Sequence, residues 1–207
     1  MNSWFNIHNP IGKFLERLWD IVCLNLLFLL CCIPVITIGT AVTALYYCML
    51  KISRGQDCSS AGMYIHSFRN NLKQGSFLTL FFAVLYIFVL VDIQACNIID
   101  IELIKYIKII LYIVLVVLIM VTSYVFPLLA QFENTNIALF KNAFFMSIIN
   151  FRYTCAIIIL NVIPILLFIS LPQLFLLSFP VWLTFGFSVI VLINSKMFVK
   201  MFDQFIE

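Results

Sequence analysis

The chain has 207 residues, of which 64% are hydrophobic and 10% are charged, and its mean hydropathy is +1.14. A soluble domain has about a quarter of its residues charged, so this composition excludes an ordinary water-soluble protein. The 12 basic and 9 acidic residues gather in short stretches between long apolar ones. We therefore expect an all-α, polytopic bundle of transmembrane helices that forms one domain over residues 1–207.

The first apolar tract covers residues 21–50 and follows an N-terminal segment, residues 1–20, that we expect at the membrane interface. A helix crosses a bilayer with about 20 residues, so this tract is too long for one level span and too short for two. Pro34 and Gly39 interrupt it, because proline removes a helical hydrogen bond and glycine is a weak helix former. We expect either one broken span or a short hairpin, with the interruption inside the bundle or at its mouth.

Further spans follow along the chain. Each charge-free tract is long enough for one helix, except the last, which is long enough for two. We place the turn between those two at residues 170–173, since Pro172 disfavours helix there, and residues 178–180 are the alternative break. The resulting spans are 74–92, 106–132, 153–170 and 173–195, and 196–207 is expected to be a cytoplasmic tail. The total is five hydrophobic spans, or six crossings if the first tract forms a hairpin.

Lysine and arginine positions orient the chain, because cytoplasmic loops of membrane proteins are rich in basic residues. The best partition places three segments in the cytoplasm, namely 51–73, 133–152 and 196–207. Their basic residues are Lys51, Arg54, Arg69, Lys73, Lys141, Arg152, Lys196 and Lys200. Only Lys105 and Lys108 then lie outside, together with Lys13 and Arg17 if the first tract crosses once. Charge favours the hairpin and length favours the single span, so both positions of the N-terminus stay open.

Two segments on the cytoplasmic side have the periodicity of amphipathic helices at a membrane surface, 59–73 and 135–149. Their apolar positions are Ala61, Ile65, Phe68 and Leu72 in the first, and Ile137, Phe140, Phe144 and Ile148 in the second. One interpretation is that both helices rest on lipid while their cations reach the headgroups. The other is a docking surface for a partner, made of His66, Arg69, Lys73, Lys141 and Arg152.

Polar residues within the apolar tracts gather around the interruption of the first one. We predict a ligand-binding or hinge region there, made of Asn25, Pro34, Thr37, Gly39, Thr40 and Thr43. Such groups either form hydrogen bonds between helices, which we favour, or line a site for a neutral ligand such as a sugar. Asn161 is a further polar residue deep in a span. The charge-free tracts hold no ionisable coupling group, which argues against a proton-driven or sodium-driven transporter.

The sequence offers no arrangement typical of catalysis. It lacks a nucleophile spaced with a base, metal-ligand spacing and a glycine-rich phosphate loop. We therefore expect no catalytic residues, no metal and no cofactor, and predict that the protein is not an enzyme. The net charge of +3 comes from basic residues beside the spans, so the expected partner is the lipid bilayer and not nucleic acid.

Four stretches in the first half carry a family resemblance: LWDIVCLNLL (18–27), CIPVITIG (32–39), TALYY (43–47) and SFRNNLKQG (67–75). They resemble the YesL family of bacterial membrane proteins, a domain of unknown function, whose length and hydrophobic layout match the whole chain. The resemblance implies a multipass protein of the bacterial cytoplasmic membrane. It also implies an association with carbohydrate ABC importers, since members of the family are often encoded beside them. It supplies no catalytic residues.

These observations lead to three functional hypotheses. The one we favour is an accessory or regulatory partner of a carbohydrate ABC importer, docked on a permease or ATPase subunit. The first alternative is a small-solute transporter or channel that acts alone through the region near residues 34–39. The second alternative is a structural membrane bundle without a ligand.

Overall fold

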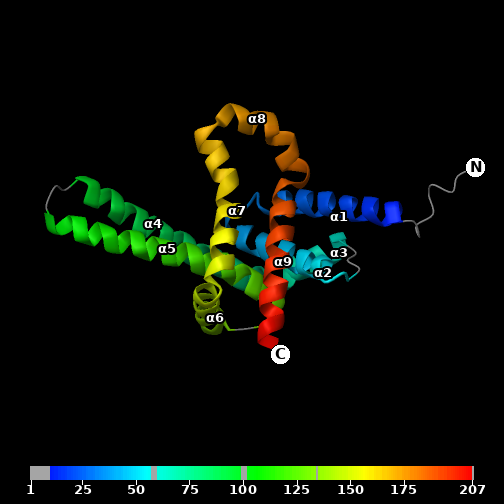
Figure 1. The fold of residues 1–207 in the computed structure, drawn as a ribbon, viewed down its shortest axis with the longest axis horizontal. Coiled ribbons are helices and arrows are strands. Elements are labelled where there is room, and N and C mark those ends of the chain that lie inside the picture. The colour runs from blue at the N-terminus through cyan, green and yellow to red at the C-terminus, as the bar shows by residue number, and fades with distance from the viewer. Residues whose placement is uncertain (1–9, 57–59, 99–101, 134, 207) are drawn as a thin grey trace, which may run out of the picture.

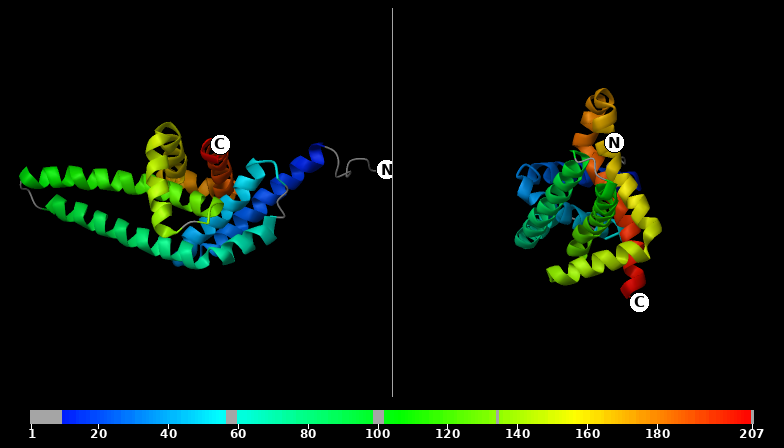
Figure 2. Two further views of the ribbon diagram at one scale, coloured as in Figure 1. Left: turned by 90° about the horizontal axis from the view of Figure 1, so that it is seen from below. Right: turned by 90° about the vertical axis from the view of Figure 1, so that its left-hand side faces the viewer.

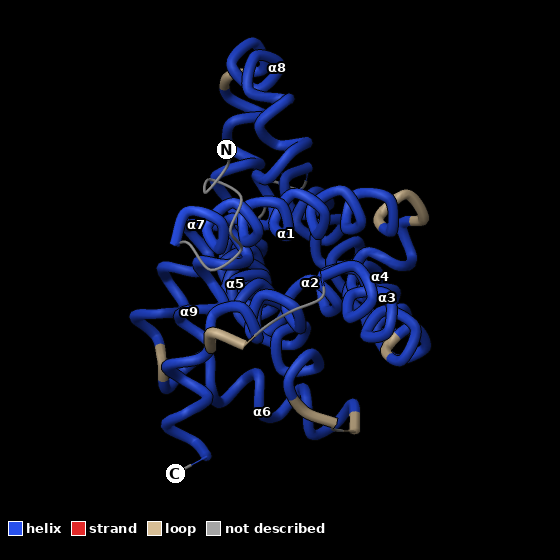
Figure 3. The backbone as a smooth tube through the Cα atoms, turned by 90° about the vertical axis from the view of Figure 1, so that its right-hand side faces the viewer, coloured by secondary structure: helices blue, strands red, loops and turns tan. Residues whose placement is uncertain are grey.

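The computed structural model describes residues 10–56, 60–98, 102–133 and 135–206, and every regular element in these ranges is helical (Figures 1 and 3). The α-helices are α1 (Pro10–Cys31), α2 (Ile38–Ser53), α3 (Ser60–Asn70), α4 (Leu72–Ile98), α5 (Glu102–Gln131), α6 (Asn136–Ile149), α7 (Phe151–Ser170), α8 (Pro172–Val181) and α9 (Phe187–Ile206). A short 3-10 helix, Val35–Thr37, precedes α2, and a π-helical turn, Trp182–Gly186, joins α8 to α9. The prediction of an all-α protein is confirmed.

Among the residues that the structure describes, five helical stretches are long and apolar enough to cross a membrane: Val35–Ser53, Leu72–Ile98, Ile104–Gln131, Phe151–Ser170 and Leu176–Gln204. Protein leaves much of their apolar surface uncovered, as at Ile87, Ile113 and Leu177, which are 62%, 59% and 80% exposed. Lipid accommodates a surface of this kind, whereas water does not. The chain is therefore a multipass membrane protein.

The first apolar tract forms a helical hairpin. Helix α1 ends at Cys31, the chain reverses through the 3-10 helix, and α2 returns alongside α1 (Figures 1 and 2). The Thr37 hydroxyl supports the turn, donating to the carbonyl oxygens of Cys31 at 2.7 Å and Pro34 at 2.8 Å. The predicted break near Pro34 is thus confirmed, and the geometry is that of the hairpin alternative. Helix α1 takes up the second half of the segment expected at the interface, whose residues 1–9 lie outside the described ranges.

Two longer hairpins leave the centre of the molecule in different directions. Helices α4 and α5 lie side by side and extend to the left in Figure 1, while α7 and α9 run across them and meet at α8. Figure 2 shows the same divergence, since α7 and α9 are seen nearly along their axes while α4 and α5 lie in the plane of its left view. The turn that separates α7 from α8 falls at Leu171, within the predicted 170–173.

The polar ends of several helices meet in one place, which we call the base. Arg54, at the end of α2, donates to Gln131 of α5 at 3.2 Å and forms an ion pair with Asp203 of α9 at 3.4 Å. Gln74 of α4 donates to Asn136 of α6 at 2.8 Å. The segments predicted to share one side of the membrane therefore lie together. Lys105 and Lys108, which are predicted on the opposite side of the membrane, lie in the first turns of α5, at the far end of the α4–α5 hairpin (Figure 1).

The central core is formed where the hairpins cross. Tyr124 of α5 and Tyr46 of α2 pack against the ring of Phe198 of α9, with centroids 5.1 Å and 5.8 Å away and nearly perpendicular planes. The segment 196–207, expected to be a tail, continues α9 up to Ile206 instead. Phe198, Met201 and Phe202 are fully buried, because the last turns of α9 lie between α2, α5 and the base. These three residues of α9 therefore contribute to the core.

The helix predicted at 59–73 forms as α3 and the first turn of α4, but it packs through a different face. Tyr64 and Ser67 are buried against α1 and α2, and the Tyr64 hydroxyl donates to the Ala41 carbonyl oxygen at 3.3 Å. Ile65 and Leu72, from the predicted apolar face, are exposed. Periodicity identifies an apolar face without saying whether protein or lipid covers it.

The helix predicted at 135–149 forms as α6, and it too packs mainly through a face other than the predicted apolar one. Its buried residues are Leu139, Ala143, Met146 and Ser147. Of the predicted apolar face, Phe140 packs on the core beside Phe82, with ring centroids 5.5 Å apart, whereas Ile137, Phe144 and Ile148 are exposed. Small side chains on the buried face allow α6 to approach α5 closely.

Candidate functional site

The predicted hinge region is the point where α2 and α4 touch. The backbone amide of Gly39 donates to the Thr79 hydroxyl at 3.0 Å, and that hydroxyl donates to the Gly75 carbonyl oxygen at 2.7 Å. A Cβ at Gly39 would collide with Thr79 and the ring of Phe126. A Cβ at Gly75 would lie 2.6 Å from Thr40 Oγ1 and 2.9 Å from Thr40 Cα. Glycine is therefore required on both helices for this crossing.

The threonines of the same region also serve the packing. Thr40 and Thr43 are fully buried. Thr40 Oγ1 lies 3.3 Å from Ser76 Oγ, and the Thr43 hydroxyl donates to the Gly39 carbonyl oxygen at 2.8 Å. The Thr40–Ser76 contact joins α2 to α4, whereas the hydroxyls of Thr43 and Thr37 bond within α2 and within the turn.

Asn25 belongs to a separate structure, the π-helical turn between α8 and α9. It is fully buried, and its Nδ2 donates to the carbonyl oxygens of Trp182 at 3.1 Å and Leu183 at 2.7 Å. Its Oδ1 accepts from the backbone amide of Ser188 at 3.0 Å. A π turn inserts an extra residue and takes backbone groups out of the regular helical ladder. The single amide of Asn25 satisfies groups on both ends of this turn.

The π turn has a local cause in the sequence. Pro180 lacks the N–H needed for the helical ladder, and the turn starts two residues later. Gly186 allows the Trp182 ring to fold across the backbone, since a Cβ there would lie 2.5 Å from Trp182 Cε3. The ring then packs on Phe187, with centroids 5.6 Å apart. The predicted alternative break at 178–180 therefore lies within α8, and the widened turn begins just after it, at Trp182.

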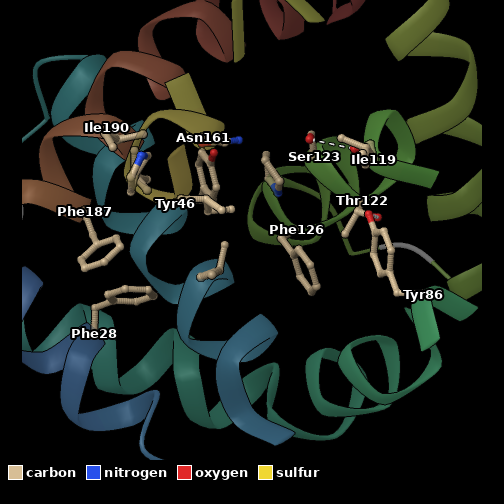
Figure 4. A pocket seen from close by; sticks show the side chains of 15 residues that line it. Phe28, Tyr46, Tyr86, Ile119, Thr122, Ser123, Phe126, Asn161, Phe187 and Ile190 are labelled. Atoms are coloured by element: carbon tan, nitrogen blue, oxygen red, sulfur yellow. Dashed lines mark hydrogen bonds between the residues drawn. The ribbon is translucent and has the colours of Figure 1, made fainter. Parts of the chain in front are cut away.

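A cavity of about 380 Å³ lies where the three hairpins meet, and we call it the central cavity (Figure 4). Its lining comes from α1, α2, α4, α5, α7 and α9, and comprises Phe28, Val42, Tyr46, Tyr86, Ile119, Thr122, Ser123, Phe126, Pro127, Asn161, Pro164, Ile165, Phe187, Ile190 and Val191. No charged side chain is among these lining residues. Its volume falls within the about 300–1,000 Å³ of small-molecule sites in proteins.

Most polar groups that line the central cavity are bonded to protein. The hydroxyls of Tyr86 and Thr122 lie 3.0 Å apart, and the Ser123 hydroxyl donates to its own helix at 2.8 Å. Asn194 donates to Asn161 Oδ1 at 3.0 Å and to the Tyr46 hydroxyl at 3.3 Å. Of the residues that line this cavity, only Asn161 was identified from the sequence as a polar residue deep in a span. The remaining lining residues are typical of apolar or aromatic residues in any span, so their local sequence does not predict that they line a cavity.

A second hollow, the polar groove, lies at the base and has a volume of about 930 Å³. One wall comes from α3 and the start of α4, with His66 and Lys73, and the other from the end of α5 and the start of α6, with Glu133. Of the predicted docking residues, the groove brings His66 and Lys73 together. Arg69, Lys141 and Arg152 are exposed and lie outside the groove lining, with Arg69 next in sequence to the lining residue Asn70. Within the described ranges, no three His, Cys, Asp or Glu side chains gather as a metal-binding group.

Comparison with known families gives one match. Residues 21–93 match a family model described as a protein of unknown function, DUF624. The matched stretch runs from α1 into α4, so it includes Asn25 and the crossing at Gly39 and Gly75. The match is compatible with the YesL resemblance, which rests on residues of the same stretch. Neither curated proteins nor solved structures provide a match to the chain.

Proposed function

We propose that this multipass membrane protein is an accessory or regulatory partner of a carbohydrate ABC importer and docks on it through the base. The observation that carries the proposal is the polar groove, which joins His66, Lys73 and Glu133 in one hollow. The importer and its carbohydrate class come from the family resemblance. The positive-inside rule places the base in the cytoplasm, where a permease loop or an ATPase subunit is accessible.

The groove has the chemistry of a protein docking site. It holds both signs of charge together with amide side chains, including Asn70, whose Nδ2 lies 3.1 Å from His66 Nε2. On such a surface, charge complementarity with a partner raises the specificity and the association rate more than the affinity. Exposed Ile65 and Leu72 on the adjoining helix wall add apolar contact area. No catalytic step is part of the proposed role.

The proposal is tested by purifying the tagged full chain from its native membrane in mild detergent after crosslinking. We expect an ABC permease or its ATPase to be recovered in near-equal amount. Lys73→Glu and Arg69→Glu should weaken that recovery, because they reverse charge at or beside the groove. Lys105→Glu is the matched control, since Lys105 lies at the opposite end of the α4–α5 hairpin. Recovery of the chain alone, or equal loss with the control, contradicts the proposal.

Transport by the chain alone is the competing proposal, and the central cavity between the spans favours it. It requires solute flux into liposomes that contain only this protein. Because the cavity lining has no charged side chain, the solute would be neutral. Flux of neutral sugars equal to that of empty vesicles eliminates this alternative.

A further inference from the structure

We infer that the central cavity is a binding site for one acyl chain of a membrane lipid, with the ester group of that lipid held by Asn161. This site is separate from the polar groove and does not depend on the proposed importer partnership. Its argument rests on three features: the lining, the unpaired polar groups and the route from the bilayer.

The lining suits a hydrocarbon chain. Aromatic and aliphatic side chains from six helices surround the space, as Figure 4 shows for Phe28, Phe126 and Phe187. Phe28 and Phe187 themselves pack together with centroids 5.7 Å apart, closing one side. A site without charged side chains gives no compensation for desolvating an ion, so charged solutes are excluded. Apolar ligands gain from leaving water or from dispersion contacts in such a lining.

The polar groups left over fit a single uncharged acceptor. Asn161 Oδ1 is occupied by Asn194, but Asn161 Nδ2 has no hydrogen-bond partner among the described residues. Figure 4 shows the Asn161 amide directed toward the open space that faces Ser123. An N–H donor at membrane depth needs an acceptor, and the carbonyl oxygen of a lipid ester supplies one. The Tyr46 hydroxyl accepts from Asn194 and has no acceptor for its own hydrogen among the described residues, so the lining offers two donors, Asn161 Nδ2 and the Tyr46 hydroxyl.

Lipid has a route into the cavity. Ile165, a lining residue of α7, is 57% exposed, so the lining continues to the outer surface of a candidate span. That surface is apolar and faces the bilayer interior. Pro127 and Pro164 lie in the lining of α5 and α7, where each removes a helical hydrogen bond and weakens close packing of the two helices. The nearest molecules able to enter are therefore lipid chains.

The test uses the full chain in vesicles of phosphatidylethanolamine and phosphatidylglycerol that contain a phospholipid with a photoreactive diazirine in one acyl chain. Labelled positions are mapped by mass spectrometry. We expect labelling of Val191, which lines the cavity, in addition to labelling of Val189, which bulk lipid reaches on the outer surface of the same helix. Ser123→Phe fills the cavity and should abolish the labelling of Val191. Val116→Phe is the matched control, because it adds the same ring to an exposed position of α5.

A second probe and a second variant keep the inference falsifiable. A phospholipid with the diazirine on its headgroup should not label Val191. Asn161→Leu removes the amide donor and should lower acyl-chain labelling of Val191 without changing labelling at Val189. If Ser123→Phe fails to fold, native mass spectrometry of the unchanged protein replaces that test. We expect one lipid molecule to remain bound to each chain. Labelling of Val191 that persists in a folded Ser123→Phe variant, labelling by the headgroup probe, or no retained lipid overturns the inference.

Discussion

Asn25 gives the sharpest stability prediction, because one side chain joins α1 to both ends of the π turn. Replacing Asn25 with leucine keeps the side chain size and removes all three hydrogen bonds, to Trp182, Leu183 and Ser188. Two part-buried carbonyl oxygens and the buried Ser188 amide then lose the partner that Asn25 supplies. We expect the α8–α9 connection to loosen while the remaining helices stay folded.

The size of the effect follows from the cost of these groups. Hydrogen bonds between helices in membranes average about 0.6 kcal/mol, whereas a buried polar group left unpaired costs about 1–3 kcal/mol. The π turn relaxes in part, because a regular helix recovers some of its backbone bonds. We therefore expect Asn25→Leu to lower the free energy of unfolding by about 2–4 kcal/mol.

The assay is unfolding of the purified chain in mixed micelles with increasing SDS, followed by fluorescence and circular dichroism. Trp182 reports locally, since its ring packs on Phe187 and its Nε1 donates to Ser178 at 3.2 Å. Replacing Trp4 and Trp19 with phenylalanine leaves Trp182 as the fluorophore. Leu26→Ala is the control, because Leu26 is the next residue of α1 and is 43% exposed.

Three results would refute this reasoning. Asn25→Leu with the same unfolding midpoint as the parent would mean that the π turn keeps its geometry without the amide. A loss in Leu26→Ala as large as in Asn25→Leu would mean that general packing of α1, and not the hydrogen bonds, sets the stability. Loss of helix content in both variants before any SDS is added would also contradict a local effect.

Three further predictions concern the helix crossing, the base and the topology. Gly75→Ala should destabilise the protein by about 1–3 kcal/mol in the same assay, because its Cβ meets Thr40 Cα at 2.9 Å; an unchanged midpoint contradicts the crossing. Arg54→Ala should cost less than about 1 kcal/mol, since its ion pair is solvent-exposed, and a larger loss would mean that Arg54 is structural. A cysteine replacing Lys105 should react with an impermeant thiol reagent in intact cells and one replacing Lys141 should not; the reverse pattern inverts the topology.

The hydrophobic layout was readable from the sequence because a bilayer acts on each span separately. Backbone groups in lipid must be bonded within their own helix, so tract length and charge placement predict helical spans without reference to neighbours. Proline acts equally locally. Pro34 and Pro172 therefore marked the chain reversals correctly, and Pro180 marked the π turn, although not its form.

The candidate sites were less predictable because a polar residue in a span can either line a ligand site or form hydrogen bonds where helices pack. Thr40, Thr43 and Gly39 have the composition of a ligand lining, but the structure uses them where α2 meets α4. The central cavity instead gathers residues from six helices whose sequence spacing carries no common pattern. Asn161 alone stood out, because an amide is costly in lipid wherever it lies.

Taken by itself, the sequence determined that the chain is helical, how its apolar stretches divide, and where proline turns it. Only the tertiary structure decided which faces meet protein, since α3 and α6 pack through Tyr64 and Leu139 and leave most of their predicted apolar faces exposed. It also continued the expected tail as helix α9, with Phe198, Met201 and Phe202 in the core. The physical reason is that, in a membrane, lipid and protein are both apolar surroundings, so hydrophobicity fixes that a side chain avoids water but not what covers it.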